Sequence, residues 1–169
     1  MNKLEEQKNK LEHAKLLAID TATSSMTVAL VEGGRLAEEI NSHAERNHSI
    51  YLVPSIERAL QAAGWSYGDL SAIVVGRGPG SYTGVRIGVT VAKTAAWAKR
   101  LPVIGVSTLE AMAAGAFADG LAGPGGQAQG SPVWLVPLVN GRRGRAYTAL
   151  YCWDGTGDVD GTGHVDGTG

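Results

Sequence analysis

The sequence contains very little cysteine, no long apolar run and no excess of charge of either sign. Cys152 is the single cysteine among 169 residues, which excludes an internal disulfide framework and is typical of a reducing compartment. Apolar runs stay below the roughly 18 residues of a membrane span, and the charged start MNKLEEQKNKLEH lacks the apolar centre of a signal peptide. A net charge of −1 gives no electrostatic footprint for independent nucleic-acid binding. We therefore expect a cytoplasmic protein.

The residues that are present alternate between strand and helix patterns, after a polar N-terminal extension over residues 1–14 that we place outside the fold. Their order predicts an α/β domain over residues 15–118, with a mixed sheet flanked by helices. The predicted strands are Leu16–Asp20, Met26–Glu32, Arg35–Ile40, Ala72–Gly76 and residues 102–106, and the predicted helices are residues 49–63, Tyr82–Arg100 and one that opens with the capping box Ser107–Glu110.

The second half of the chain predicts a much less complete unit. Residues 119–132 form a linker rich in glycine, alanine and proline, and residues 133–153 predict one hairpin of a truncated second domain. Asp-Gly-Thr-Gly recurs from positions 154, 160 and 166, and this composition predicts a disordered tail over residues 154–169. The spacing of its aspartates matches neither an EF-hand loop nor a glycine-rich nonapeptide, so calcium binding is the less favoured interpretation.

The stretch GRGPGSYTGVRIG, over residues 76–88, resembles a phosphate-binding loop but fails both common spacings. A P-loop requires Gly-Lys-Ser or Gly-Lys-Thr at its end, and a dinucleotide fingerprint requires a third glycine where Ser81 stands. Gly80, Gly84 and Gly88 instead recur every four residues, so a helix would place them in one row. Glycine inside a helix costs roughly 0.5–1 kcal/mol relative to alanine, which suggests that another backbone approaches closely there. Ser81 is a candidate helix N-cap.

The helix that follows is apolar on most sides, which indicates burial on most sides. In so small a domain, one side would face the sheet and another a partner subunit; the alternative is a central helix of a larger monomer. The predicted partner surface also includes the preceding helix, and its residues are His48, Leu52, Ile56, Tyr82, Gly84, Val85, Gly88, Val89, Ala92 and Ala96.

Five segments occur in an order that resembles the TsaB family: LLAIDTATSSMTVALVEGG, NHSIYLVPSIERAL, GRGPGSYTGVRIGVTVAKTAAWA, LPVIGVSTLEAMA and PLVNGRRGRAYTALY. The resemblance implies the actin/Hsp70/sugar-kinase (ASKHA) fold and a non-catalytic subunit in synthesis of N6-threonylcarbamoyladenosine in tRNA. It also implies pairing with the catalytic subunit TsaD, a homodimer when alone, and assembly with the ATPase TsaE. The complex as a whole would take its ATP and metal through those other subunits and contact tRNA only when assembled.

The resemblance also locates positions where catalytic features would be weakened. The metal-binding histidine pair of TsaD falls on Thr108 and Met112, and neither side chain supplies an imidazole. The first phosphate loop has Ala22 where glycine is usual, which leaves at most a weak nucleotide site at Asp20, Thr21, Thr23 and Ser24. Asp20 could hold Mg²⁺ through water, although a turn aspartate is the commoner explanation. We therefore expect no cofactor of the chain's own.

Two further activities stay open from the residues alone. The glycine loop and Asp20 leave an ASKHA-type ATPase or phosphotransferase as an alternative, and scattered serines such as Ser24 and Ser25 leave a peptidase-like hydrolase. Arg142, Arg143 and Arg145 form the one basic cluster, which could contact tRNA phosphate or simply be a solvated turn. The family usually has acidic residues on both sides of this turn, whereas this chain has Asn140-Gly141 before it and Arg145 after it.

Overall fold

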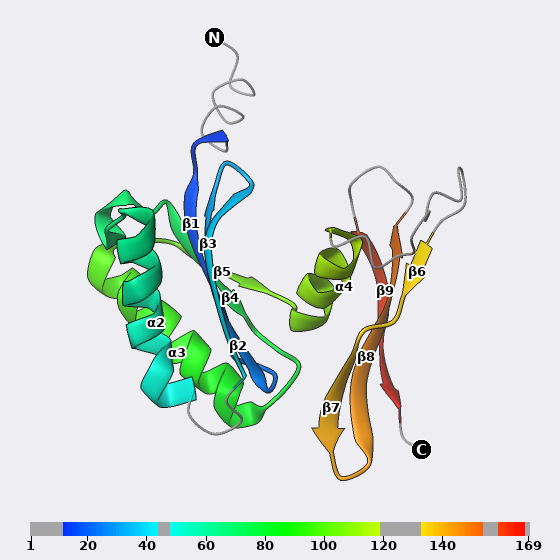
Figure 1. The fold of residues 1–169 in the computed structure, drawn as a ribbon. Coiled ribbons are helices and arrows are strands. Elements are labelled where there is room, and N and C mark those ends of the chain that lie inside the picture. The colour runs from blue at the N-terminus through cyan, green and yellow to red at the C-terminus, as the bar shows by residue number, and fades with distance from the viewer. Residues whose placement is uncertain (1–11, 44–47, 119–132, 154–158, 168–169) are drawn as a thin grey trace.

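The computed structural model describes residues 12–43, 48–118, 133–153 and 159–167 (Figure 1). The first part of the chain forms a five-stranded sheet in the order β3-β2-β1-β4-β5. Its strands are β1 (Lys15–Asp20), β2 (Ser25–Glu32), β3 (Arg35–His43), β4 (Ala72–Gly76) and β5 (Val103–Val106). Strand β1 pairs antiparallel with β2 and parallel with β4, so the sheet is mixed. The predicted α/β class, with a mixed sheet flanked by helices, is confirmed.

The hairpin between β2 and β3 forms where the paired glycines predicted it. Gly33 and Gly34 both have positive φ angles, of 55° and 80°, and Glu32 pairs with Arg35 across them. Two consecutive left-handed residues define the primed turn that matches the twist of an antiparallel pair. Strand β2 buries Met26, Val28 and Leu30 on one face, and a bulge between Leu30 and Val31 shifts the register by one residue between them and the turn.

Helices α2 (His48–Ala63) and α3 (Tyr82–Lys99) lie side by side on one face of this sheet (Figure 1). Both connect parallel strands, β3 to β4 and β4 to β5, so the two helices run in the same direction. The core between the helices and the sheet is built largely from large side chains of α2 and the strands, because α3 contributes small residues. It contains Leu17, Ile19, Met26, Val28, Leu30, Leu52, Ile56, Leu60, Ile73 and Val75.

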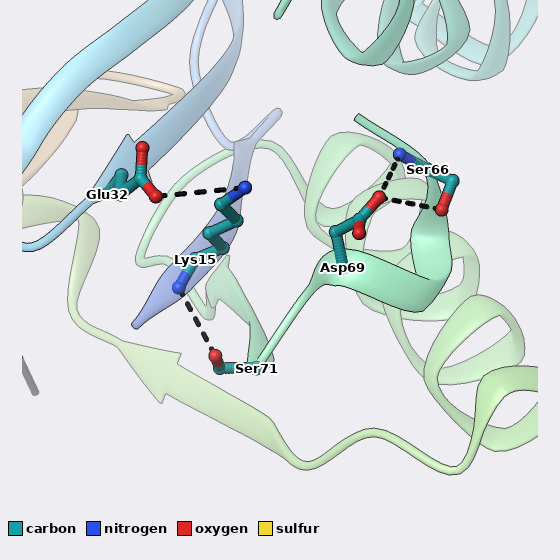
Figure 2. A network of polar contacts seen from close by, with 5 residues as sticks. All are labelled: Lys15, Glu32, Ser66, Asp69 and Ser71. Atoms are coloured by element: carbon teal, nitrogen blue, oxygen red, sulfur yellow. Dashed lines mark hydrogen bonds and ion pairs between the residues drawn. The ribbon is translucent and has the colours of Figure 1, made fainter. Parts of the chain in front are cut away.

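A short 3₁₀ helix, η1 (Tyr67–Asp69), connects α2 to β4 and is held by polar contacts at the start of β1. Figure 2 shows the Asp69 carboxylate accepting hydrogen bonds from the backbone N–H and hydroxyl of Ser66, at 2.7 and 2.8 Å. The Lys15 backbone N–H donates to the Ser71 hydroxyl at 3.2 Å, and the Lys15 ammonium lies 3.7 Å from a Glu32 carboxylate oxygen. These contacts fix the loop that returns the chain to the sheet.

The second part of the chain is a four-stranded sheet with α4 (Thr108–Ala118) packed against it. Its strands are β6 (Val133–Leu135), β7 (Leu138–Arg142), β8 (Arg145–Trp153) and β9 (Val159–Gly167). Leu109 and Ala113 of α4 share a small core with Val139 and Tyr151. Helix α4 therefore packs with the second sheet, although the sequence grouped it with the first domain. No helix in the described ranges is both long and apolar enough to cross a membrane.

The prediction of a disordered tail over residues 154–169 is wrong for the segment that forms β9. Strand β9 pairs antiparallel with β8, from Val159 opposite Trp153 to Gly167 opposite Ala146. The tail has little apolar surface to bury, but the edge of β8 offers backbone donors and acceptors that any non-proline residue can pair with. Residues 133–153 likewise contribute three strands, β6, β7 and β8, instead of one simple hairpin. Residues 1–11 of the predicted extension over 1–14, and the predicted linker over 119–132, lie outside the described residues.

Candidate functional site

The glycine stretch lies against the turn between β1 and β2 of the same chain. A Cβ atom added at Gly80 would overlap the Ala22 carbonyl, and one added at Gly84 would overlap the Thr21 carbonyl. At Gly88 it would lie 2.5 Å from the Thr21 hydroxyl oxygen. The predicted close approach of a backbone is therefore confirmed at Gly80 and Gly84, whereas at Gly88 the approaching group is a side chain. The prediction that this backbone belongs to another protein is wrong, because the β1–β2 turn occupies the space.

Two hydrogen bonds connect this turn to the start of α3. The Ser81 backbone N–H donates to the Ala22 carbonyl at 2.6 Å, and the buried Thr21 hydroxyl donates to the Gly84 carbonyl at 2.7 Å. Ser81 also caps α3 as predicted, because its hydroxyl accepts from the Gly84 backbone N–H at 3.3 Å. The first turn of α3 and the loop that could have cradled a phosphate are thus bonded to each other.

Asp20 joins the end of β1 to the start of α4. One carboxylate oxygen accepts from the Ala22 backbone N–H at 2.7 Å, and the other accepts from the Thr108 hydroxyl at 2.8 Å. The Thr108 backbone N–H donates to the Gly78 carbonyl at 2.9 Å. A Cβ atom at Gly76 would overlap the Asp20 carboxylate, so glycine at that position makes room for it. Asp20 has the bonding of a turn aspartate that also anchors α4.

The four residues of the predicted weak nucleotide site do not present a common set of donors. Asp20 and Thr21 direct their polar atoms to the contacts just described, and Thr21 is 1% exposed. The Thr23 hydroxyl donates to the Ser25 carbonyl and accepts from the Ser25 backbone N–H, at 3.2 and 3.1 Å. Ser24 is the exposed member of the group. A nucleotide site here stays a prediction.

The structure brings together a serine and a histidine that the sequence reasoning did not connect. Ser25 faces His43 across β2 and β3, with the serine hydroxyl 3.1 Å from His43 Nδ1. The turn alone would place Ser25 opposite Ser42, and the bulge between Leu30 and Val31 shifts its partner to His43, so the sequence pattern does not reveal the pair. Both side chains lie at the exposed end of the hairpin, where a pair of this kind serves equally well as a cross-strand contact.

Most of the residues predicted to meet a partner are instead core residues. Leu52, Ile56, Gly84, Gly88, Ala92 and Ala96 are buried within this chain, so the prediction is wrong for them. The physical reason is that the small residues spaced four apart form the face of α3 that lies closest to the sheet. Val85 and Val89 are half-buried, and Tyr82 is 75% exposed. His48 begins α2, but its side chain lies outside the described residues.

A set of large apolar side chains on the same two helices is exposed, and it shares Tyr82 with the predicted surface. It contains Ile50, Tyr51 and Val53 of α2, and Tyr82 and Trp97 of α3, and we call it the exposed α2/α3 face. Trp97 is the extreme case, with 86% of its surface exposed. The Arg86 guanidinium lies 5.2 Å from the centre of the Tyr82 ring and donates to its hydroxyl at 3.1 Å. Sequence reasoning missed Trp97, although a tryptophan among the polar positions of a helix was the available signal.

At the C-terminal ends of these helices, a groove of about 540 Å³ has aromatic and charged side chains in its lining. The Lys15 ammonium lies 4.6 Å from the centre of the Trp65 ring, and the Lys99 ammonium lies 5.8 Å from that of Tyr67. Burial, and secondarily the nearby charge of Glu57, raises the pKa of Tyr67 above its usual value. Both rings are thus already in contact with cations of the same chain, which favours a structural role.

Known proteins similar to this chain include TsaB proteins and a solved structure of the same fold. The family model for tRNA N6-adenosine threonylcarbamoyltransferase, TsaD, matches residues 36–163. The tRNA threonylcarbamoyladenosine biosynthesis protein TsaB of Bacillus subtilis is 41% identical over 137 residues, which is 80% of this chain and 54% of that protein. YeaZ from Pseudomonas aeruginosa superposes with a TM-score of 0.79 at 30% identity, over 90% of this chain and 67% of that one. The chain belongs to the TsaB (YeaZ) family.

Other TsaB relatives give the same picture. TsaB of Escherichia coli is 38% identical over 146 residues, which is 85% of this chain and 57% of that protein. This chain therefore spans about half the length of the curated TsaB proteins it matches.

Proposed function

We propose that the chain is a non-catalytic subunit that binds and activates TsaD in the modification of tRNA to N6-threonylcarbamoyladenosine. The observation that carries this proposal is the exposed α2/α3 face of a TsaB-family chain. Five large apolar side chains on two adjacent helices are what a protein interface leaves exposed in an isolated subunit. Membership of a family whose relatives are named for this biosynthesis supplies the pathway.

A partner of the same fold suits this face. The chain matches the family model of TsaD itself, so a TsaD molecule would present corresponding helices. Two similar faces can associate around a pseudo-two-fold axis, as identical faces do in a symmetric dimer. The same geometry would allow two copies of this chain to pair when TsaD is absent. TsaE and tRNA would then join the assembled pair.

The residues around the C-terminal end of β1 and the start of α4 favour a scaffold over an enzyme. Thr108 occupies a position where the resemblance places a metal-binding histidine, and its hydroxyl bonds to Asp20 instead. Met112, at the second such position, is 40% exposed and supplies only a thioether. The first turn of α3 is bonded to the loop that would have held a phosphate. ATP and metal would therefore act through the other subunits.

The proposal is tested by pairing with TsaD. The change Trp97→Glu should weaken the TsaB–TsaD complex by about 30-fold or more, which corresponds to roughly 2 kcal/mol, the usual threshold of an interface hot spot. Size-exclusion chromatography with light scattering, followed by titration calorimetry, measures this loss. The matched control is Leu36→Glu, because Leu36 is a 60% exposed apolar residue that belongs to β3 and not to either helix.

Circular dichroism should show the same secondary structure for both variants, because neither side chain is part of the core. Unchanged affinity for TsaD in Trp97→Glu, with a parallel Tyr51→Asp variant also unchanged, would refute the assignment of the interface to the exposed α2/α3 face.

A further inference from the structure

The turn between β7 and β8 concentrates positive charge at the end of the second sheet. Arg142, Arg143 and Arg145 are all exposed, and we call them the arginine turn. Figure 1 shows this turn at the lower end of the sheet, away from α4. Arg142 and Arg145 pair directly across the two strands, so their side chains lie on the same face. Three guanidinium groups therefore project from one hairpin tip.

The backbone of this turn is unfavourable for the residues it contains. Arg142 and Arg143 have φ angles of 61° and 53°, in the left-handed region where glycine and asparagine are preferred. A bulge between Asn140 and Arg142 precedes the turn, and the Asn140 side chain accepts from the Arg142 backbone N–H at 2.8 Å. Asparagine or glycine at positions 142 and 143 would form the same turn with less strain. Strained backbone of this kind concentrates at functional sites.

The charges of the arginine turn also oppose one another. Like charges directly opposite on paired strands are destabilising, and Arg142 and Arg145 stand in that relation. In the described part of the chain, the ion pair that forms is Lys15 with Glu32, on the first sheet, and none involves these arginines. The repulsion between the charges at this tip would be relieved by an external anion.

We propose that the arginine turn contacts the phosphate backbone of tRNA in the TsaB–TsaD complex, a role that rests on the function proposed above. The planar guanidinium group of arginine can donate two parallel hydrogen bonds to one phosphate, and three such groups can bind successive phosphates. Such contacts position a nucleic acid without reading its sequence. The net charge of −1 makes the isolated chain a poor binder, so this local charge acts only as an added contact within an assembly.

The test compares two variants that each lose two arginines to asparagine. Arg142→Asn with Arg143→Asn removes charge from the turn while keeping a residue that tolerates the left-handed backbone. The control, Arg35→Asn with Arg100→Asn, removes the same charge elsewhere, and Arg100 is also left-handed and exposed, with φ of 56°. Each is combined with TsaD, and affinity for unmodified tRNA is measured by fluorescence anisotropy between 50 and 300 mM salt.

The arginine-turn variant should bind tRNA about 10-fold more weakly at 100 mM salt, and its slope of log K against log salt should fall by about 1–2. The control should match the wild-type complex. Equal affinity and slope for both variants would overturn the proposal. Loss of TsaD assembly in the arginine-turn variant alone, seen by light scattering, would assign the turn to a protein contact and overturn it too. If the wild-type chain does not assemble with TsaD, the proposed function itself fails.

Discussion

At Gly84, helix α3 passes so close to the β1–β2 turn that no side-chain carbon fits between them. The hydrogen of Gly84 faces the Thr21 carbonyl, and the Thr21 hydroxyl in turn donates to the Gly84 carbonyl at 2.7 Å. Both groups are buried, so a displacement of the turn would leave a buried donor and acceptor without each other. The stability of the first sheet therefore depends on the absence of one methyl group.

The change Gly84→Ala should lower the free energy of unfolding by about 1–3 kcal/mol, because the added methyl group forces backbone apart in a packed core. Chemical denaturation at neutral pH measures the difference. Gly115→Ala in α4 is the matched control: a Cβ atom there meets nothing within 4 Å, so alanine should be neutral or stabilising by about 0.5–1 kcal/mol.

Equal stability of the two alanine variants would contradict the close packing of α3 on the β1–β2 turn.

The glycine spacing in α3 also shows what a sequence pattern can and cannot establish. The four-residue repeat of glycines indicates that something approaches α3 closely, because an internal helix glycine has a cost that needs a reason. The repeat does not indicate whether the approaching backbone is that of Thr21 in the same chain or that of a partner protein.

At the scale of the elements, the stability of η1 should respond to acid. Hydrogen bonds from the backbone N–H and then the hydroxyl of Ser66 lower the pKa of Asp69 below its usual value. A carboxyl with a lowered folded-state pKa stabilises the protein fully above its unfolded-state pKa, near 4. That contribution is lost as the pH falls through the lower, folded-state pKa.

We therefore expect the free energy of unfolding of the wild-type chain to fall more steeply between pH 5 and pH 2 than that of Asp69→Asn. Urea denaturation followed by tryptophan fluorescence at each pH measures the two slopes. Glu39→Gln removes another exposed carboxyl, on β3, and should leave the wild-type slope unchanged. Coincident slopes for wild type and Asp69→Asn would show that the capping box of η1 has no part in acid stability.

Elements governed by local patterns were predictable, whereas those defined by distant partners were not. The β2–β3 turn follows from two adjacent glycines, and the start of α3 follows from Ser81. Strand β9 forms because the edge of β8 is available, and its Gly- and Asp-rich sequence has no strand pattern of its own. The Ser25–His43 and Asp20–Thr108 contacts depend on register and on tertiary packing across 88 positions in the second case, so no motif reveals them.

At the scale of the whole molecule, the described chain contains two hydrophobic cores that share no residue. The larger lies between α2, α3 and the first sheet, and the smaller joins Leu109 and Ala113 of α4 to Val139 and Tyr151. The start of α4 follows directly from β5, and the Thr108 hydrogen bonds to Asp20 and Gly78 tie it further to the first sheet. Because buried apolar contacts set local stability, the two sheets should open separately.

The change Tyr151→Ala should therefore raise the hydrogen-exchange rates of β7 and β8 amides by 10-fold or more and leave β1 and β4 amides protected. Ile73→Ala, in the larger core, should lower the global free energy of unfolding by about 2–5 kcal/mol and raise exchange in β1 and β4. Mass-spectrometric exchange resolves the strands. Equal loss of protection in both sheets from Tyr151→Ala would contradict separate opening. It would mean that the Asp20–Thr108 contact couples the two sheets into one cooperative unit. Adding Thr108→Val to Tyr151→Ala would then have to restore the protection of β1 and β4.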